Sequence, residues 1–278
     1  MQALEGGIDP GHAAFLHSKR SGANRRGPFL INRLMAQDIE AHVHVLQEDY
    51  GVLIATRREH EEGEFWRTNV FLMPFYTMAG RFGDTPIVRW SGWIPMDDEN
   101  TMRWQVECDT VQPILQNDSW VQERVAQGRP PLGQDLDDTL AEDLEPPSHR
   151  IGSPFRTLPN QENDYFMDRS VQKEWNYSGM SNGNVEDQAV TESMGVIYAR
   201  HREHLGTTDL GIIATRQVLL RAAKAIRDTG ATPRGVDNPG AYRVNASNMV
   251  LPTGGDWVVR VREATKAEPG VYTRMASL

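Results

Sequence analysis

Apolar and polar residues alternate along much of the first half of the chain. Five runs carry this pattern or are rich in aromatic residues: 41–46, 51–56, 64–76, 86–94 and 101–108. In the last run, Met102, Trp104 and Val106 alternate with polar residues. Alternation with a period of two is typical of strands with one buried face. Short polar segments at 48–50 and 97–100 separate neighbouring runs, so the pattern predicts an antiparallel meander.

The second half of the chain shows helical periodicity instead. Residues 186–202 are predicted to form one helix, and Thr207 or Thr208 can cap a second helix that ends at Gly230. The second helix carries a single apolar stripe, formed by Ile212, Leu219, Ala223 and Ile226. Two final short strands are expected at 241–250 and 256–261. Strands followed by a long helix predict an α+β fold, in which an antiparallel β-sheet packs against helices.

Irregular sequence separates the predicted strands from the predicted helices. Residues 110–160 are rich in Pro, Asp and Gly and show no period. Acidic residues fill half of the stretch 134–145: Asp135, Asp137, Asp138, Glu142, Asp143 and Glu145. A segment of this length is typical of an insertion, and we interpret its acidic part as a solvated loop, with a lid or a partner-docking surface as alternatives. Residues 1–278 are otherwise expected to form a single domain, in which a basic, glycine-rich loop at 18–33 follows a short first helix.

Composition narrows the class of protein. Of the 278 residues, 39% are hydrophobic and 24% are charged, and no apolar run reaches the roughly 18 residues of a membrane span, which indicates a globular protein outside the membrane. The N-terminal residues lack the apolar core of a secretory signal, so we expect a cytoplasmic location. The net charge of -9 argues against a nucleic-acid partner. The single cysteine, Cys108, excludes intrachain disulfides and Cys-rich metal sites within this chain.

Two histidines and a carboxylate lie close together near the N-terminus, in the spacing D-x2-H-x4-H formed by Asp9, His12 and His17. Two imidazoles and one carboxylate can hold a divalent transition metal and leave other positions open. On an ideal helix the two histidines would be about 140° apart, so both reach one ion only where the helix bends. The spacing alone also fits two ordinary histidines on a short helix.

The residues around this motif, LEGGIDPGHAAFLH at 4–17, resemble the mononuclear-iron motif in the catalytic α subunits of Rieske-type aromatic-ring-hydroxylating oxygenases. The most similar group is the phthalate 4,5-dioxygenase-like branch. A second stretch resembles the same branch in the same order, from 163–165 through 177–179 and on to 186–195 and 203–209. The resemblance implies a helix-grip (START/Bet v1-like) catalytic domain, in which a curved antiparallel β-sheet wraps on a long C-terminal helix.

In that family two histidines and one aspartate hold the iron. Carried onto this sequence, the resemblance implies His12, His17 and Asp187 as ligands of Fe(II), with Glu186 as the rival carboxylate. It also implies that Asp9, the candidate catalytic residue, lies beside the first histidine and connects it to the Rieske centre of a neighbouring subunit. Capping of the first helix is an alternative role for Asp9, and the two roles are compatible.

The resemblance implies that the chain hydroxylates or dihydroxylates an aromatic, carboxylated substrate with O2. Electrons would come from a Rieske [2Fe-2S] cluster, reduced in turn by an NAD(P)H-dependent reductase. Oxidative O-demethylation of lignin-derived aromatics is an alternative reaction, and a homotrimer or a multiple of it is the expected assembly. A Rieske cluster needs two Cys and two His, and this chain has one cysteine. We therefore expect a fragment, a truncated reading frame or half of a split enzyme, inactive without a Rieske-bearing partner.

Two other classes of function fit the same residues. One is a helix-grip protein that binds an aromatic or lipid-like ligand without catalysis, and the other is a zinc hydrolase that uses the same His and carboxylate ligands. His42 and His44 share a strand face but lack a third metal ligand nearby. Four arginines on the predicted strands can pair with a substrate carboxylate or with structural acids: Arg57, Arg67, Arg89 and Arg103.

Overall fold

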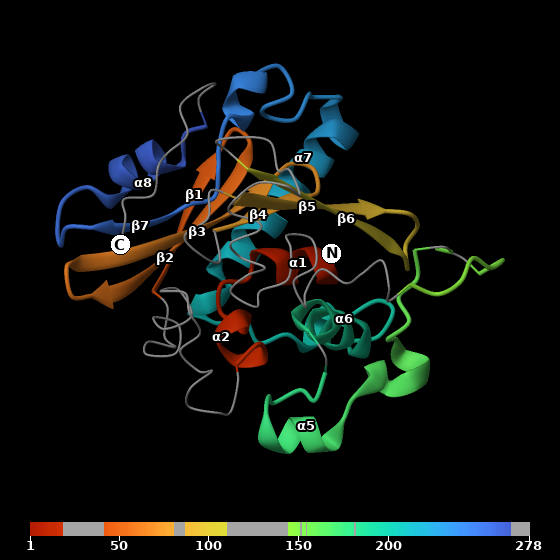
Figure 1. Cartoon of the computed structure of the whole chain (residues 1–278). Coiled ribbons are helices and arrows are strands. Elements are labelled where there is room, and N and C mark those ends of the chain that lie inside the picture. Colours follow the sequence, from red (N-terminus) through yellow and green to blue (C-terminus); the bar gives the residue numbers. More distant parts are fainter. Residues whose placement is uncertain are drawn as a thin grey trace.

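The computed structural model describes residues 1–18, 42–80, 87–109, 144–150, 152–153, 155–180 and 182–267. Its α-helices are α1 (Gln2–Ile8), α2 (His12–Leu16), α5 (Arg169–Glu174), α6 (Gly183–Ser193), α7 (Leu210–Thr229) and α8 (Trp257–Thr265) (Figure 1). Its strands are β1 (His42–Glu48), β2 (Gly51–His60), β3 (Gly63–Leu72), β4 (Tyr76–Ala79), β5 (Ile87–Pro95), β6 (Thr101–Asp109) and β7 (Asn248–Leu251). The 3-10 helices within these residues are η2 (Gln161–Phe166), η3 (Arg200–Arg202), η4 (Thr207–Asp209) and η5 (Pro239–Tyr242).

Strands β1 to β6 follow one another in the sheet in chain order, and each pairs with the next in the antiparallel direction. β3 is long enough for two partners on one edge, because β4 pairs with its C-terminal end and β7 with its N-terminal end. The predicted curved antiparallel sheet, the α+β class and the helix-grip arrangement are confirmed. The predicted run at 64–76 divides between β3 and β4.

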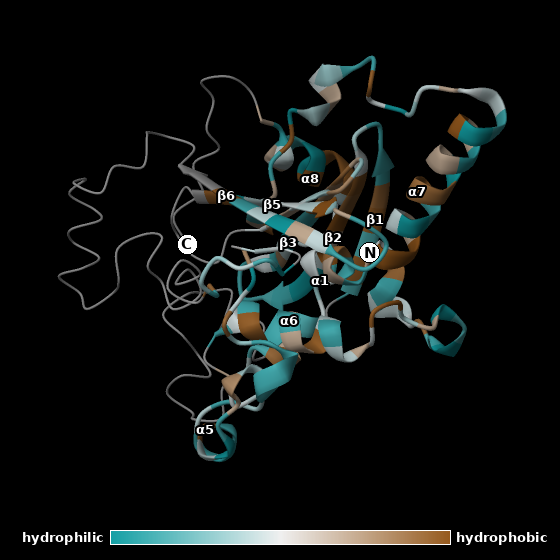
Figure 2. Cartoon of the chain, turned by 90° about the vertical axis from the view of Figure 1, so that its right-hand side faces the viewer, coloured by the Kyte–Doolittle hydropathy of each residue, from teal (hydrophilic) through white to brown (hydrophobic). Residues whose placement is uncertain are grey.

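Both faces of the sheet are covered, so strand β2 is apolar at successive positions rather than only at alternate ones. Leu53 and Ala55 point to a core cluster that includes Val261 of α8. Val52 and Ile54 point to the opposite cluster, which contains residues of α1 and α7. Figure 2 shows apolar residues gathered on the central strands and on the part of α7 beside them.

The long helix α7 lies across β1 and β2 and ends where the sequence predicts, at Gly230 in the left-handed conformation (φ 68°). It begins at Leu210, after the short η4. Gly211 lies against Ile54, where a Cβ atom would come within 2.5 Å of Cδ1, so a side chain here would displace the strand residue. The predicted apolar stripe is only partly correct. Its last member, Ile226, is 50% exposed, because the end of α7 extends past the sheet (Figure 2).

Two further predictions are correct only in part, and a third is wrong. The predicted helix 186–202 ends at Ser193, and Gly195 follows with φ 90°. The predicted strand 241–250 is reduced to the four residues of β7, preceded by η5. The predicted strand 256–261 is helix α8, because the side chain of Asp256 accepts hydrogen bonds from the backbone N–H of Val258 and Val259 and caps a helix there.

Strand β6 does not bury Trp104 and Val106, although its alternation is typical of a strand with one buried apolar face. Trp104 is 55% exposed, whereas Arg103 reaches helix α6 and donates a hydrogen bond to Asn184. The loop at 19–33 and the acidic residues 134–143 lie outside the described residues. Where the irregular segment is described, Leu144 and Thr157 form an isolated β-bridge. Among the described helices, none combines the length and apolar character needed to cross a membrane.

Candidate metal centre

A break between two short helices places the first residues of the site. Helix α1 ends at Ile8, and Asp9 and Pro10 redirect the chain before α2 begins at His12. The carboxylate of Asp9 accepts hydrogen bonds from the backbone N–H groups of Gly11 (2.7 Å) and His12 (3.1 Å). The capping role that the sequence suggests for Asp9 is not found in that form, because Asp9 is the C-cap residue of α1 and Gly11 is the N-cap residue of α2. The Asp9 carboxylate instead holds the backbone of the residues that open α2.

The bend that the D-x2-H-x4-H spacing requires is present at the other end of α2. Only residues 12–16 are helical, and His17 follows with φ -90° and ψ 10°, outside regular helical geometry. The two imidazole rings consequently lie edge to face, with 5.3 Å between their centroids and an interplanar angle of 79°. Both rings face helix α6.

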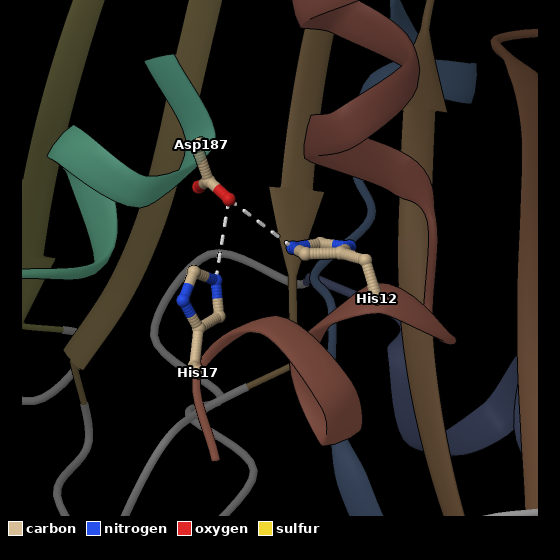
Figure 3. A group of neighbouring side chains, drawn as sticks. All are labelled: His12, His17 and Asp187. Atoms are coloured by element: carbon tan, nitrogen blue, oxygen red, sulfur yellow. Dashed lines mark ion pairs between the residues drawn. The ribbon is translucent and has the colours of Figure 1, made fainter. Parts of the chain in front are cut away.

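Helix α6 supplies the third residue of the group. Asn182 caps this helix by accepting a hydrogen bond from the backbone N–H of Val185. Oδ1 of Asp187 then lies 3.6 Å from Nε2 of His12 and 3.3 Å from Nε2 of His17 (Figure 3). Potential ligand atoms of the three side chains all lie within 4.8 Å of one another. The fold therefore brings together residues about 170 positions apart in the sequence.

Each imidazole has a second partner on its other nitrogen. Nδ1 of His12 lies 2.9 Å from the backbone oxygen of Asp9 and 3.4 Å from the carboxylate of the same residue. Nδ1 of His17 lies 2.6 Å from Oε2 of Glu186. Because both Nδ1 atoms face acceptors, Nε2 of each ring is left for the space beside Asp187. Glu186, the rival carboxylate in the sequence, thus contacts the outer edge of a histidine ring rather than joining the group of three.

Negative charge dominates the electrostatics of this group. Burial alone would lower the pKa of His17, but its hydrogen bonds to Asp187 and Glu186 outweigh burial and raise its pKa to about 10. Burial would raise the pKa of Asp9, but hydrogen bonds from the His12 side chain and the Gly11 backbone lower it below its ordinary value. The negative charge around His17 attracts a cation, and a metal ion that binds there has to displace the proton on His17.

The donor set fits a divalent transition metal. Imidazole nitrogen and carboxylate oxygen are the ligands that suit iron, zinc and related ions. Two ligand atoms that each lie about 2.1 Å from one ion, with a ligand–metal–ligand angle of about 90° to 110°, are about 3.0 to 3.4 Å from each other. The distances from Asp187 to the two histidines are close to this range. The side chains of His12, His17 and Asp187 are 25%, 28% and 41% exposed, so each of them is partly accessible to solvent.

The other candidate residues lie elsewhere or have structural contacts. His44 packs against the rings of Trp66 and Trp257. Arg57 forms an ion pair with Glu64, at 2.7 Å, which agrees with the structural alternative for this arginine. Arg67 is buried and donates a hydrogen bond to the backbone oxygen of Gly80, and Arg89 lies on β5 opposite Ala79. Arg103 is bound to Asn184 on α6, the helix that carries Asp187.

Sequence reasoning did not identify Ser178 as part of the site. Its hydroxyl group donates a hydrogen bond to Oε1 of Glu186, on the side of the carboxylate away from His17. The residue falls in one of the segments that resemble the oxygenase family, at 177–179. That resemblance is the available signal in the sequence, because no spacing rule connects a serine in a loop with a histidine about 160 residues earlier.

Comparisons with known proteins agree with the chemistry of this group. A family model described as "LigXa C-terminal domain like" matches residues 1–276. The oxygenase subunit of 3-chlorobenzoate-3,4-dioxygenase from Comamonas testosteroni is 29% identical over 266 residues, which cover 92% of this chain and 58% of that protein. The oxygenase subunit of phthalate 4,5-dioxygenase from Pseudomonas putida is 26% identical over 236 residues, which cover 81% of this chain and 48% of that protein. The chain thus spans about half the length of these relatives, and the resemblance drawn from the sequence is confirmed.

Proposed function

Because the chain belongs to the LigXa C-terminal domain-like family, we propose that it is the oxygen-activating part of a Rieske-type oxygenase that acts on an aromatic carboxylate. The observation that carries this proposal is the convergence of His12, His17 and Asp187. Their types and order match the iron ligands implied by the family resemblance. The names of the two relatives, which specify 3-chlorobenzoate and phthalate, support an aromatic carboxylate as the substrate class.

In this proposal the two Nε2 atoms and Oδ1 of Asp187 hold Fe(II). Two imidazoles and one carboxylate leave coordination positions open, and the ion when bound supplies the redox-active centre for the reduction of dioxygen. The protein keeps the imidazoles in place through their Nδ1 atoms, which contact the backbone oxygen of Asp9 and the carboxylate of Glu186. These contacts orient the donor atoms before the metal arrives, so little reorganisation accompanies binding.

Electrons have to reach the site from outside this sequence. A Rieske cluster uses two cysteine ligands, and the 278 residues contain one cysteine. We therefore propose a partner chain or domain that carries the cluster, served by an NAD(P)H-dependent reductase, and a trimeric assembly that brings the two centres together. Asp9 is the proposed connection, since it contacts His12 and keeps 22% of its side chain exposed for a neighbouring subunit.

Isotope incorporation tests the proposed activity. The chain, loaded with Fe(II), is combined with a Rieske-bearing partner, a reductase and NADH, and given 3-chlorobenzoate or phthalate under 18O2. We expect a hydroxylated or dihydroxylated product that carries 18O, detected by mass spectrometry, and no such product with Asp187→Ala. Product formed without 18O, or an equal yield from the Asp187→Ala variant, would contradict the proposal.

A further inference from the structure

Glu186 is a buried carboxylate that the group of three potential ligands does not use. Its side chain is 6% exposed. A carboxylate in such a place is costly unless other groups compensate its charge and its hydrogen-bonding capacity. Here Oε2 lies 2.6 Å from Nδ1 of His17, and Oε1 accepts a hydrogen bond from the hydroxyl group of Ser178. Both oxygens therefore have a partner, and one of these partners is a proposed iron ligand.

Helix α6 holds the His17 ring from two sides. Residues 186 and 187 are neighbours on this helix, and their side chains diverge by about 100° around its axis. Asp187 meets the ring at Nε2, at 3.3 Å, and Glu186 meets it at Nδ1, at 2.6 Å. These two nitrogens lie on different edges of the imidazole. The Glu-Asp pair thus fixes the position of the ring and also its rotation about the Cβ–Cγ bond.

Ser178 keeps the carboxylate in this orientation. Its hydroxyl oxygen also accepts a hydrogen bond from the backbone N–H of Met180, at 3.2 Å, so the serine is itself held in place. The other histidine has a different arrangement, because Nδ1 of His12 lies 2.9 Å from the backbone oxygen of Asp9 and 3.4 Å from the carboxylate of the same residue. A carboxylate acceptor makes an imidazole a stronger electron donor to a metal than a carbonyl acceptor does. The two histidines therefore differ in how close a carboxylate oxygen lies to Nδ1, which is 2.6 Å for His17 and 3.4 Å for His12.

We propose that Glu186, held by Ser178, is a positioning residue for the metal site. It accepts the Nδ1 proton of His17 in a hydrogen bond, and it thereby keeps the Nε2 lone pair directed at the ion. This inference rests on the proposed function, since it assumes that the group around Asp187 binds a divalent metal. It adds a carboxylate and a serine that act through His17 without touching the metal.

Cobalt(II) is a suitable probe, because it occupies iron sites and has an absorption spectrum sensitive to ligand geometry. Metal-free full chain is titrated with Co(II) in the wild type and in Glu186→Leu, Glu186→Gln and Ser178→Ala. We expect Glu186→Leu to weaken binding by about 10- to 100-fold and to change the d–d absorption. Glu186→Gln retains an acceptor oxygen and should recover part of the affinity, and Ser178→Ala should cause a smaller loss in the same direction.

Glu192→Leu is the matched control. Glu192 lies on the same helix, and its carboxylate accepts a hydrogen bond from the hydroxyl group of Tyr165, at 2.7 Å, rather than from a histidine. We expect wild-type Co(II) affinity and spectrum for this variant. An equal loss in Glu192→Leu and Glu186→Leu would overturn the inference, because it would reduce the effect to general disruption of α6.

The outcomes separate this inference from the proposed function. A wild-type chain that binds neither Co(II) nor Fe(II) would contradict both. A wild-type chain that binds Co(II), with Glu186→Leu unchanged in affinity and spectrum, would contradict the role of Glu186 alone. If Glu186→Leu does not fold, the losses of Co(II) affinity in Glu186→Gln and Ser178→Ala test the role of Glu186 instead. Wild-type Co(II) affinity in both of these variants would overturn that role.

Discussion

Arg216 on α7 anchors helix α1, which leads into the candidate metal centre. Its guanidinium group donates two hydrogen bonds to Glu5 on α1, at 2.7 and 2.9 Å, and two to Glu203, at 2.5 and 2.9 Å. Arg200 contacts the same two glutamates, at 2.8 and 2.6 Å. We predict that Arg216→Met, which removes the charge and keeps much of the side-chain volume, loosens α1 from α7 and lowers the stability of the whole chain.

The burial of this cluster sets the size of the expected effect. The side chains of Arg216, Glu5 and Glu203 are 21%, 11% and 13% exposed. Removal of one partner from a fully buried ion pair costs about 3–5 kcal/mol, whereas an exposed pair contributes about 0–1 kcal/mol. Because Arg200 still pairs with both glutamates, we expect a loss of about 2–3 kcal/mol. For a chain of this size that loss lowers the melting temperature by roughly 4–12 °C.

Thermal and urea unfolding, followed by circular dichroism, measure this loss. Arg227→Met is the matched control on the same helix, because Arg227 is 71% exposed and pairs with the neighbouring Asp228. We expect a change within about 0.5 kcal/mol for the control. If Arg216→Met unfolds at the same temperature and urea concentration as Arg227→Met, the cluster does not anchor α1 and the reasoning is wrong.

Three further predictions concern acid, a partly buried histidine and a helix end. Hydrogen bonds from Arg216 lower the pKa of Glu203 to about 2. The stability that this carboxylate contributes is therefore complete above pH 4.5 and is lost as the pH falls toward 2. Glu203→Gln should remove this pH-dependent part of the stability, which unfolding curves measured across that range would show. Burial lowers the pKa of His44 in the folded chain. As the pH falls below about 6.5, His44 therefore binds a proton in the unfolded chain before it does so in the folded chain. Wild type should consequently lose stability between pH 7.5 and 5.5 relative to His44→Phe. Equal slopes for the two proteins would contradict this. Gly230→Ala should lower the free energy of unfolding in urea by about 1 kcal/mol. The cause is backbone strain alone, because φ is 68° at this residue while the space around the Cβ position is open. An unchanged urea midpoint would refute this prediction.

The sequence pattern predicted the elements that depend only on residues close together in the chain. The strand runs and the end of α7 at Gly230 belong to this group. The β-branched run at 256–261 is typical of a strand, yet the capping side chain of Asp256 decides in favour of helix α8. The alternation in β6 does not say which neighbour covers which side, so it does not predict that Trp104 is exposed. Here Arg103 faces α6 because Asn184 provides an acceptor.

The candidate site divides in the same way. The spacing of Asp9, His12 and His17 is local and visible in the sequence, as is the need for a bend between the two histidines. Asp187 came from resemblance alone, because no local rule pairs residues about 170 positions apart. The contact between Glu186 and Nδ1 of His17 depends on how α6 is rotated against α2, which side-chain packing determines and sequence pattern does not.

The most direct test of the account is the metal content of the purified chain. Metal-free protein is titrated anaerobically with Fe(II), and the bound ion is counted by elemental analysis for wild type, His12→Ala, His17→Ala and Asp187→Ala. We expect one Fe(II) per wild-type chain and loss of that ion in each variant, with the fold retained by circular dichroism. Wild-type chain that binds no Fe(II), or variants that bind it as wild type does, would contradict the claim that these three residues form an iron centre.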